Sequence, residues 1–301
     1  MFTSDLECHQ VSEIAQEIAS QPSCWLRAVH MVRDVAPDLP RNGERVASIG
    51  CGTSLFVAQA YAGIREAGGA GETDAFAASE FPAGRGYDAV VAISRSGTTT
   101  EVIRALSDVD RARSVAISAV PGSPVLEAAG RRIVVDFADE RSVVQTRFAT
   151  SVVALLRAHL GADLTDAIAG GERALATGTP ADVAAFSHFV FLGHGWTIGL
   201  ANEAALKMRE AARAHAESYP AMEYRHGPIT MAGAETLVWI LGSPDPGVAE
   251  DVRATGATVV TASLDPMAEL VWIQRAAIEL AEARGLDPAA PRNLTRSVVL
   301  S

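Results

Sequence analysis

Short runs of β-branched and other apolar residues alternate with longer stretches in the first half of the chain. Four runs lie at residues 44–50, 88–93, 114–119 and 131–137. Each run is short, and helix-length stretches separate them, which is the pattern of parallel strands joined by crossover helices. The apolar stretch at residues 151–160 predicts a long helix that closes this half of the chain.

A second series of strands begins after a segment rich in glycine, threonine and proline at residues 176–184. Its apolar runs lie at residues 188–193, 236–242 and 257–263. We therefore place a domain boundary between residues 163 and 184. This predicts one α/β domain over residues 1–165, which includes an N-terminal helix, and a second over residues 166–301.

The two halves also resemble each other in the order of their segments. Residues 47–66 align with 190–210, each as a strand, a GxG turn and a helix, and residues 90–106 align with 237–254. This predicts the duplication of one nucleotide-binding-like α/β unit, a tandem repeat.

Two loops at the ends of predicted strands, "CGTS" at 51–54 and "SRSGTT" at 94–99, have the composition of an anion site. Both combine hydroxyl side chains with the first amides of a helix, which lack intrahelical partners. The alternative is that these hydroxyls only cap two helices. The counterpart of the second loop, "GSPDPG" at 242–247, has two prolines without amide hydrogens and one aspartate. Any phosphate is therefore expected in the first half.

The charge of the whole chain limits the partners that it can bind. The formal net charge is −11 and the pI is about 5.1, so there is no basic field for nucleic acid or for an anionic membrane surface. The N-terminus has acidic residues where a secretory signal would be basic, and no apolar run reaches the length of a membrane span. We expect a cytoplasmic protein.

The three cysteines, Cys8, Cys24 and Cys51, are an odd number and lack CxxC spacing. They suggest neither a disulfide framework nor a zinc site, and reduced, mostly buried thiols are expected. The sequence predicts no metal and no cofactor.

A strongly helix-forming segment carries three charged residues at i, i+4 and i+7, which share one helical face: Glu203, Lys207 and Glu210. Lys207 is the only lysine of the chain. A solvated stripe of ion pairs is the alternative interpretation. A pair of His215 and Glu217 follows, and then the irregular loop "EYRHGP", which holds His226; these residues favour a functional site.

A carboxylate and an imidazole near a phosphate site suit proton transfer on a sugar phosphate. Interconversion of an aldose and a ketose requires ring opening, removal of a proton beside the carbonyl and its return to the neighbouring carbon. A carboxylate can move the carbon-bound proton and a histidine can open the ring. Spacing alone does not assign these roles.

The motifs "GCGTS", "SRSGTTTE", "EAALKMRE", "HAES", "RHGP" and "PRNLTRSV" together resemble the sugar isomerase (SIS) family. The pattern is most similar to the isomerase half of glucosamine-6-phosphate synthase and to stand-alone phosphosugar isomerases and amino-sugar-phosphate deaminases. The resemblance extends from about residue 20 to the end of the chain. It implies two tandem SIS domains, each a three-layer αβα sandwich with a parallel sheet.

The resemblance also implies roles for individual residues. Those that hold the phosphate are Thr53, Ser54, Ser94, Arg95, Ser96 and Thr99. Val143 and Gln145 correspond to a sugar-contacting segment. Glu210 corresponds to the carboxylate that moves the C1/C2 proton, and Lys207 to the active-site lysine on the same helix. His226 corresponds to the ring-opening histidine, which the family supplies from the neighbouring subunit, so a homodimer is expected.

The sequence departs from the synthase pattern in two places. The family module begins almost at once, and Cys8 lies in a predicted helix rather than serving as a glutaminase nucleophile, so glutamine-dependent amination is not expected. Arg296 stands where the synthase has a Schiff-base lysine. An arginine cannot act as an amine nucleophile. Two roles for Arg296 stay open: contact with an anionic part of the substrate, or an ion pair with a carboxylate.

The leading functional hypothesis is therefore an enzyme that isomerises a hexose or hexosamine 6-phosphate, with ammonia release when the sugar carries an amine. A fructosamine-6-phosphate deglycase is one alternative, because it would use the same site. A non-catalytic sugar-phosphate-binding module is another. A pure sensor needs the phosphate loops but no base, so Glu210 and His226 favour catalysis.

Overall fold

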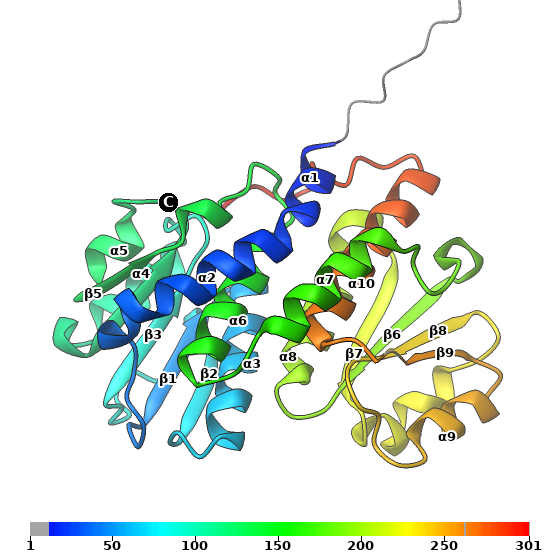
Figure 1. Cartoon of the computed structure of the whole chain (residues 1–301), viewed down its shortest axis with the longest axis horizontal. Helices are drawn as coiled ribbons and strands as arrows, with labels where there is room; N and C mark the ends of the chain where they lie inside the picture. The colour runs from blue at the N-terminus through cyan, green and yellow to red at the C-terminus, as the bar shows by residue number, and fades with distance from the viewer. Residues whose placement is uncertain (1–11, 262, 301) are drawn as a thin grey trace, which may run out of the picture.

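The computed structural model describes residues 12–261 and 263–300 and contains two parallel β-sheets covered by helices (Figure 1). This confirms the α/β class with parallel sheets. Cys8 lies outside the described residues. Among the described cysteines, Cys24 is buried and Cys51 is partly buried, and both are free thiols.

The first sheet has five parallel strands in the order β2-β1-β3-β4-β5. The strands are β1 (Val46–Gly50), β2 (Thr73–Ala77), β3 (Ala89–Ile93), β4 (Ser114–Ser118) and β5 (Arg131–Val134). The predicted runs became β1, β3, β4 and β5. Strand β2 was not predicted, because "TDAFA" has no β-branched apolar residue and lies, half-buried, at the edge of the sheet.

The second sheet has four parallel strands in the order β7-β6-β8-β9. They are β6 (His188–Gly193), β7 (His215–Pro220), β8 (Thr236–Ile240) and β9 (Thr258–Thr261). Strand β7, "HAESYP", was not among the predicted strands, because its residues do not form an apolar run. The order corresponds to that of the first four strands of the other sheet, as duplication of one unit would produce.

Helices join the strands and cover both sheets (Figure 1). In the first half they are α1 (Glu13–Ala19), α2 (Gln21–Val35), α3 (Thr53–Ala67), α4 (Thr100–Ser107), α5 (Pro124–Ala128), α6 (Arg147–His159) and α7 (Thr165–Ala176). In the second half they are α8 (Thr197–Ala212), α9 (Val248–Ala254) and α10 (Pro266–Ala283). The helix predicted at residues 151–160 is the main part of α6.

One large apolar core joins the inner faces of the two sheets. Side chains that alternate along β3 divide between two clusters: Val91 and Ile93 belong to the shared inner core, whereas Val90 and Ala92 face an outer cluster with α4 and α5. Helices α3, α6, α8 and α10 fill the inner layer, and α9 covers the outer face of the second sheet.

Two glycines allow α3 and α8 to pack closely in opposite directions. A Cβ atom on Gly199 would lie 2.5 Å from the carbonyl oxygen of Phe56, and one on Gly63 would lie 2.8 Å from Cα of Trp196. Because the helices are antiparallel, the first turn of α3 meets the last turns of α8. This contact brings the carboxyl edge of the first sheet to the residues near Lys207.

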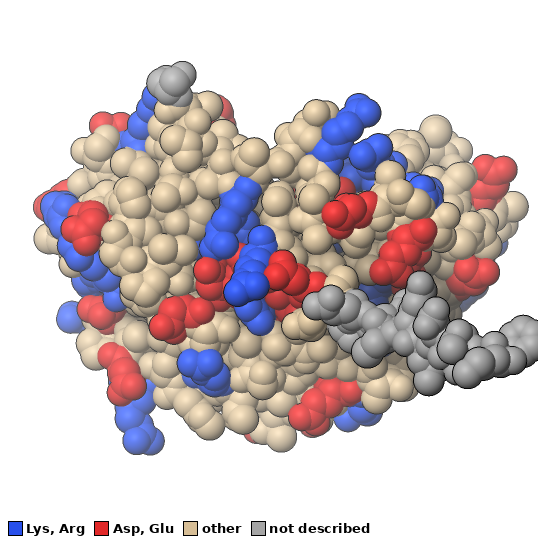
Figure 2. Space-filling model, turned by 90° about the horizontal axis from the view of Figure 1, so that it is seen from above, with Lys and Arg blue, Asp and Glu red and all other residues tan. Residues whose placement is uncertain are grey.

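Acidic and basic side chains are interspersed on the face of the molecule shown in Figure 2. Within residues 12–261 and 263–300, no helix has both the length and the apolar character needed to cross a membrane.

Candidate functional site

The two hydroxyl-rich loops lie side by side because the strand order of the first sheet reverses at β1. Strands β1 and β3 are neighbours, so the loops that follow their carboxyl ends border one crevice, the usual ligand position in an open α/β sheet. Thr53 and Ser54 are the first residues of α3 and are buried. Gly52 precedes them with φ of +54°, a conformation that favours glycine.

The loop of residues 94–99 is organised by its own hydroxyl groups. The Ser94 hydroxyl accepts a hydrogen bond from the Gly97 amide at 3.2 Å and lies 3.2 Å from the Thr99 hydroxyl. Gly97 has φ of +65°, and a Cβ there would lie 1.9 Å from Oγ of Ser123, so only glycine fits. The loop therefore has a fixed backbone that groups hydroxyls at the start of α4.

The C-terminal segment, residues 291–300, lies across the loop of residues 94–99. The Ser297 hydroxyl is 3.1 Å from Oγ of Ser96 and 2.8 Å from Oγ1 of Thr98, and the carbonyl of Val298 accepts from the Thr100 amide at 3.4 Å. Ser297 belongs to the motif "PRNLTRSV", but no role was predicted for it. The motif was the only signal that could have identified it.

Arg95 is almost completely buried, with 2% of its surface exposed, and its guanidinium contacts protein carbonyls. It donates to Ser142 at 2.7 Å, to Val143 at 3.3 Å and to Arg296 at 3.0 Å. Burial lowers the pKa of Arg95, and the nearby carboxylate of Glu140 opposes this effect. Among the described residues, the guanidinium is thus directed at these carbonyls, and it fastens residues 142–143 and Arg296 to the loop of residues 94–99.

The segment with Val143 and Gln145 is held by a buried glutamate. The carboxylate of Glu140 accepts from the Thr146 amide at 2.6 Å and from the Arg147 amide at 2.8 Å, at the start of α6. Burial raises the pKa of Glu140, against the effect of Arg95. Within the described part of the chain, Oε1 of Gln145 is buried and has no hydrogen bond.

Arg296 lies against the same segment. Its guanidinium forms an ion pair with Asp139 and donates to the carbonyl of Glu140 at 2.6 Å. Of the two roles left open by the sequence, the structure therefore contains the ion pair with a carboxylate.

Lys207 joins the two halves of the chain at the centre of the site. Its Nζ lies 3.2 Å from Oγ1 of Thr53, 3.3 Å from a carboxylate oxygen of Glu203 and 2.5 Å from Oε2 of Glu210. The Lys207 and Glu203 side chains are 1% and 2% exposed, whereas that of Glu210 is 18% exposed. Glu210 is thus the carboxylate of this cluster that a ligand can reach.

The buried charges shift the pKa values of this cluster. Burial raises the pKa of Glu203 to about 7, although Lys207 lowers it in part. Burial favours the neutral form of Lys207, but the carboxylates of Glu203 and Glu210 outweigh this effect and raise its pKa. Lys207 is therefore held as a cation. Glu203 shares the predicted helical face but received no site role from the sequence.

The structure does not bring His226 close to Glu210 within one chain. Helix α8 starts at the carboxyl end of β6 and runs back, so Glu210 lies just before the start of β7. His226 follows the opposite end of this six-residue strand, which is roughly 20 Å long, in a short 3₁₀ helix on the outer face of the second sheet. His226 is exposed to solvent.

The corresponding crevice of the second sheet has a different character. A cavity of about 570 Å³ lies at the carboxyl ends of β6 and β8. The Gly242 amide at this edge donates to the carboxylate of Glu269 at 3.3 Å, and His194 pairs with Asp245 at 3.2 Å. The protein's own carboxylates therefore occupy donors at this edge of the second sheet.

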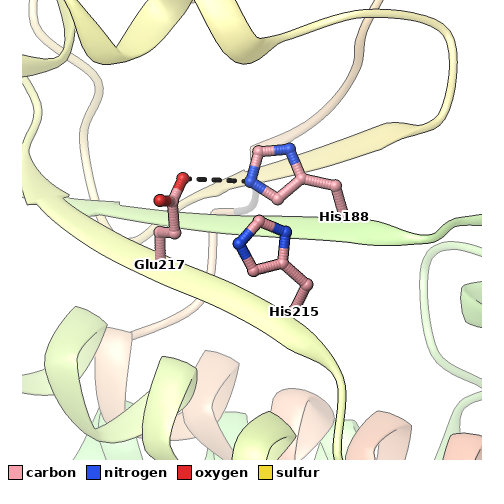
Figure 3. A group of neighbouring side chains, drawn as sticks. All are labelled: His188, His215 and Glu217. Carbon is pink, nitrogen blue, oxygen red and sulfur yellow. Dashed lines mark hydrogen bonds and ion pairs between the residues drawn. The ribbon is translucent and has the colours of Figure 1, made fainter.

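A separate group of potential metal ligands lies at the amino-terminal ends of β6 and β7 in the second sheet (Figure 3). His188 and His215 are register partners on adjacent strands with stacked rings, and Nε2 of His188 lies 3.0 Å from a carboxylate oxygen of Glu217. Thr236 lies 3.3 Å from the other ring nitrogen of His188. Among the described residues, this group could hold a divalent transition metal, although the sequence predicted none. It faces the outer cluster, so the sheet separates it from Glu210.

The chain is similar to known proteins in sequence and in fold. No protein-family model matches the chain. The glutamine–fructose-6-phosphate aminotransferase (isomerizing) of Methanothermobacter thermautotrophicus is 30% identical over 343 aligned positions, which cover 95% of this chain and 57% of that protein. The protein of the same name from Gloeobacter violaceus is 28% identical, with 88% of this chain and 53% of that protein covered. The chain spans about half the length of these curated relatives.

Solved structures share the fold. Glucosamine-6-phosphate deaminase from Thermotoga maritima has a TM-score of 0.77 at 24% identity, over 96% of this chain and 100% of that one. Tagatose-6-phosphate ketose/aldose isomerase from Escherichia coli has a TM-score of 0.75 at 18% identity, over 94% of this chain and 97% of that one. Together with the curated relatives, these matches confirm the resemblance read from the motifs and place the chain in the sugar isomerase (SIS) family.

The buried Glu269 generates a prediction for the pH dependence of stability. Burial raises its pKa to about 7, so the folded protein binds this proton more tightly than the unfolded chain does. Its contribution to stability is therefore complete below about pH 4.5 and is lost as the pH rises to about 7. Glu269→Gln should remove this decline, and its free energy of unfolding relative to wild type should rise by up to about 3 kcal/mol between pH 4.5 and 8.

Urea unfolding across this pH range measures the difference. Glu250→Gln, which changes an exposed carboxylate on α9, is the matched control and should follow the wild-type curve. Parallel pH profiles for wild type and Glu269→Gln would show that the Glu269 carboxyl is not protonated by burial.

Proposed function

We propose that the chain consists of two tandem SIS domains, residues 1–165 and 166–301, and interconverts the aldose and ketose forms of a hexose or hexosamine 6-phosphate. When the sugar carries an amine, the same proton shift leads to release of ammonia. The observation that carries this proposal is the Lys207 cluster, which joins a reachable carboxylate, Glu210, to the hydroxyl loop at Thr53. The names of the curated relatives and of the solved structures point in the same direction.

In this proposal the phosphate binds at the start of α3 and α4. Helix N-termini favour anions because their first amides are unpaired and the helix dipole is positive there. Hydroxyls of Thr53 and Ser54 would contribute from one loop, and those of Ser94, Ser96 and Thr99 from the other. Arg95 contributes by fixing the loop against the segment with Val143 and Gln145 and against the C-terminal segment. The segment with Val143 and Gln145 would in turn contact the sugar.

Glu210 would transfer the proton between C1 and C2. Lys207 engages its Oε2, which leaves Oε1 to take the carbon-bound proton and to return it to the neighbouring carbon. Lys207 is held as a cation between two carboxylates, so it is a poor amine nucleophile. With Arg296 in an ion pair with Asp139, we infer proton transfer without an imine bound to the enzyme.

We also propose that His226 opens the sugar ring in the site of a second subunit. Within one chain it lies at the far end of β7 from Glu210, and it is exposed. An exposed imidazole on the "RHGP" turn would be available to a neighbouring subunit. The complete site would then need a homodimer.

Turnover of a panel of hexose and hexosamine 6-phosphates tests the activity. Wild type should form ketose from at least one member, or release ammonia from an amino sugar. Glu210→Gln should lower the rate by about 10²–10⁴-fold, because it removes the general base. Ser96→Ala combined with Thr99→Ala should weaken binding of the same sugar phosphate, with a smaller effect on the rate at saturation. Wild-type turnover that survives in Glu210→Gln would exclude Glu210 as the base.

Mixing two inactive variants tests the shared site. Glu210→Gln and His226→Asn chains, each inactive alone, should regain up to a quarter of the wild-type activity after co-expression. One of the two sites in a mixed dimer then combines an intact Glu210 with an intact His226. A mixture as inactive as its components, although mixed dimers are detected by mass spectrometry, would show that both residues act within one chain.

A further inference from the structure

Four polar side chains gather at the amino-terminal ends of β6, β7 and β8, on the outer face of the second sheet: His188, His215, Glu217 and Thr236. Side chains alternate between the two faces of a strand, so the next residue of β6 on this face is Val190. Val190 is completely buried in the apolar outer cluster. The polar group therefore lies at the open end of an apolar face, and the proposed proton transfer makes no use of it.

Three of these side chains direct possible metal ligands at one point. His188 and His215 are register partners, and their rings stack with centroids 4.8 Å apart. Figure 3 shows that both rings turn a nitrogen toward the carboxylate of Glu217. One ligand atom from each residue lies within 4.8 Å of the other two, and Nε2 of His188 is 3.0 Å from Oε2 of Glu217. Two ligands of a tetrahedral Zn²⁺ ion are about 3.4 Å apart, so small side-chain rotations would close this group around an ion.

Thr236 holds the His188 ring in the orientation that a metal ligand needs. Its Oγ1 lies 3.3 Å from Nδ1 of His188 and accepts from the Gly233 amide at 3.2 Å. A metal-binding imidazole generally donates its other N–H to a fixed acceptor, which sets the tautomer. When Nδ1 donates to Thr236, the lone pair of Nε2 faces the carboxylate of Glu217, and a cation between them satisfies both. The alternative is a hydrogen bond from Nε2 to Glu217 without any ion.

The burial of the three side chains suits a bound ion. The side chain of His188 is 10% exposed and that of Glu217 is 30% exposed, whereas His215 is exposed to solvent. His188 is thus anchored in the sheet, and the open side at His215 gives an ion a path of entry. It also admits a water molecule to the fourth position of a tetrahedral ion. Imidazole ligands favour zinc and similar metals, whereas Mg²⁺ and Ca²⁺ favour oxygen ligands alone.

We propose that His188, His215 and Glu217 bind Zn²⁺ or a similar divalent transition metal ion, which fastens β7 to β6. Strand β7 is the edge strand of the second sheet and pairs with β6. It connects α8, which carries Glu210, to the turn that holds His226. An ion held by one residue of β6 and two of β7 would join the strands where β7 begins, in addition to their backbone pairing. This role does not depend on the sugar-phosphate reaction.

Calorimetric titration of the untagged full-length protein, first freed of metal with a chelator, tests the site with Zn²⁺ alone. Wild type should bind one Zn²⁺ at this site with micromolar or higher affinity, and Mg²⁺ far more weakly. His215→Gln and Glu217→Gln should each lower the affinity for Zn²⁺ at least about 100-fold, because even the loss of a ligand's hydrogen-bond partner typically costs 10–100-fold. Glu217→Gln keeps an oxygen that accepts a hydrogen bond from His188, so the fold should be preserved.

Two further sets of variants serve as controls. His194→Gln removes another imidazole that pairs with a carboxylate, that of Asp245, but among the described residues this pair belongs to no group of three possible ligands. It should bind Zn²⁺ as wild type does. Thr236→Val should weaken binding about tenfold, because it removes the acceptor that orients His188. Thr236→Ser, which keeps the hydroxyl, should restore the affinity.

Hydrogen exchange tests whether the ion fastens the strand. Zn²⁺ should slow amide exchange in peptides that cover residues 188–193 and 215–220, because a ligand that binds only the folded state suppresses local opening. Exchange in the last strand of the same sheet, β9, should not change. The His215→Gln and Glu217→Gln variants should show no slowing at Zn²⁺ concentrations that saturate wild type.

Three results would overturn the inference. One is the absence of Zn²⁺ binding by wild type, which would leave His188 and Glu217 as a hydrogen-bonded pair only. Another is wild-type affinity in the double variant of His215→Gln and Glu217→Gln, which would place the ion elsewhere in the chain. The third is binding that depends on these residues but leaves amide exchange in β7 unchanged, which would exclude the fastening of this strand.

Discussion

The ion cluster around Lys207 is the interaction on which the rest of the site depends. One buried ammonium contacts Thr53 of the first half and both Glu203 and Glu210 of the second. An isolated buried charge would be costly, so the two carboxylates and the hydroxyl must all remain in place around it. Any shift of α8 relative to α3 would therefore separate the carboxylate from the hydroxyl loop and leave a charge without its partners.

The close contact of α3 and α8 makes this cluster possible. The two helices run in opposite directions, and Gly63 and Gly199 let their backbones approach. The start of one helix, with its free amides, is thereby placed against the end of the other. A carboxylate from the second half can thus stand at the carboxyl edge of the first sheet, where the hydroxyl loops lie.

The two sheets have corresponding strand orders but different chemistry at their edges. The first crevice presents hydroxyls and amides, whereas in the second the Gly242 amide donates to Glu269. A buried carboxylate at this place fills the position that an anion would need. If both halves derive from one unit, as their sequences predict, their loops have diverged in the hydrogen-bond donors that they leave unpaired.

Much of this arrangement was readable from the sequence. Apolar runs predicted most strands, and the difference between "SRSGTT" and "GSPDPG" predicted the unequal loops. The spacing of Glu203, Lys207 and Glu210 predicted a shared helical face. The edge strands β2 and β7 were missed because their stability comes from pairing rather than from apolar side chains.

Contacts between distant segments could not be predicted from local patterns. The partners of Arg95 are backbone carbonyls of residues that lie about 50 and 200 positions further along the chain. The contact of Ser297 with Ser96 is of the same kind. The same holds for a cavity of about 330 Å³ beside Glu210, which Arg209 and Arg213 at the end of α8 line together with Arg292 near the C-terminus. Each depends on the tertiary fold, which no periodicity along the chain reveals.

Exchange of the carbon-bound proton with solvent tests the central claim most directly. A sugar 6-phosphate substrate is incubated with the enzyme in D₂O, and NMR measures deuterium at C1 and C2 of substrate and product. Because one carboxylate takes and returns the proton, the account predicts that wild type transfers it between C1 and C2, either directly or after exchange with D₂O, and that Glu210→Gln, folded as wild type, supports neither isomerisation nor deuterium incorporation. Isomerisation or deuterium incorporation at the wild-type rate in Glu210→Gln would contradict it.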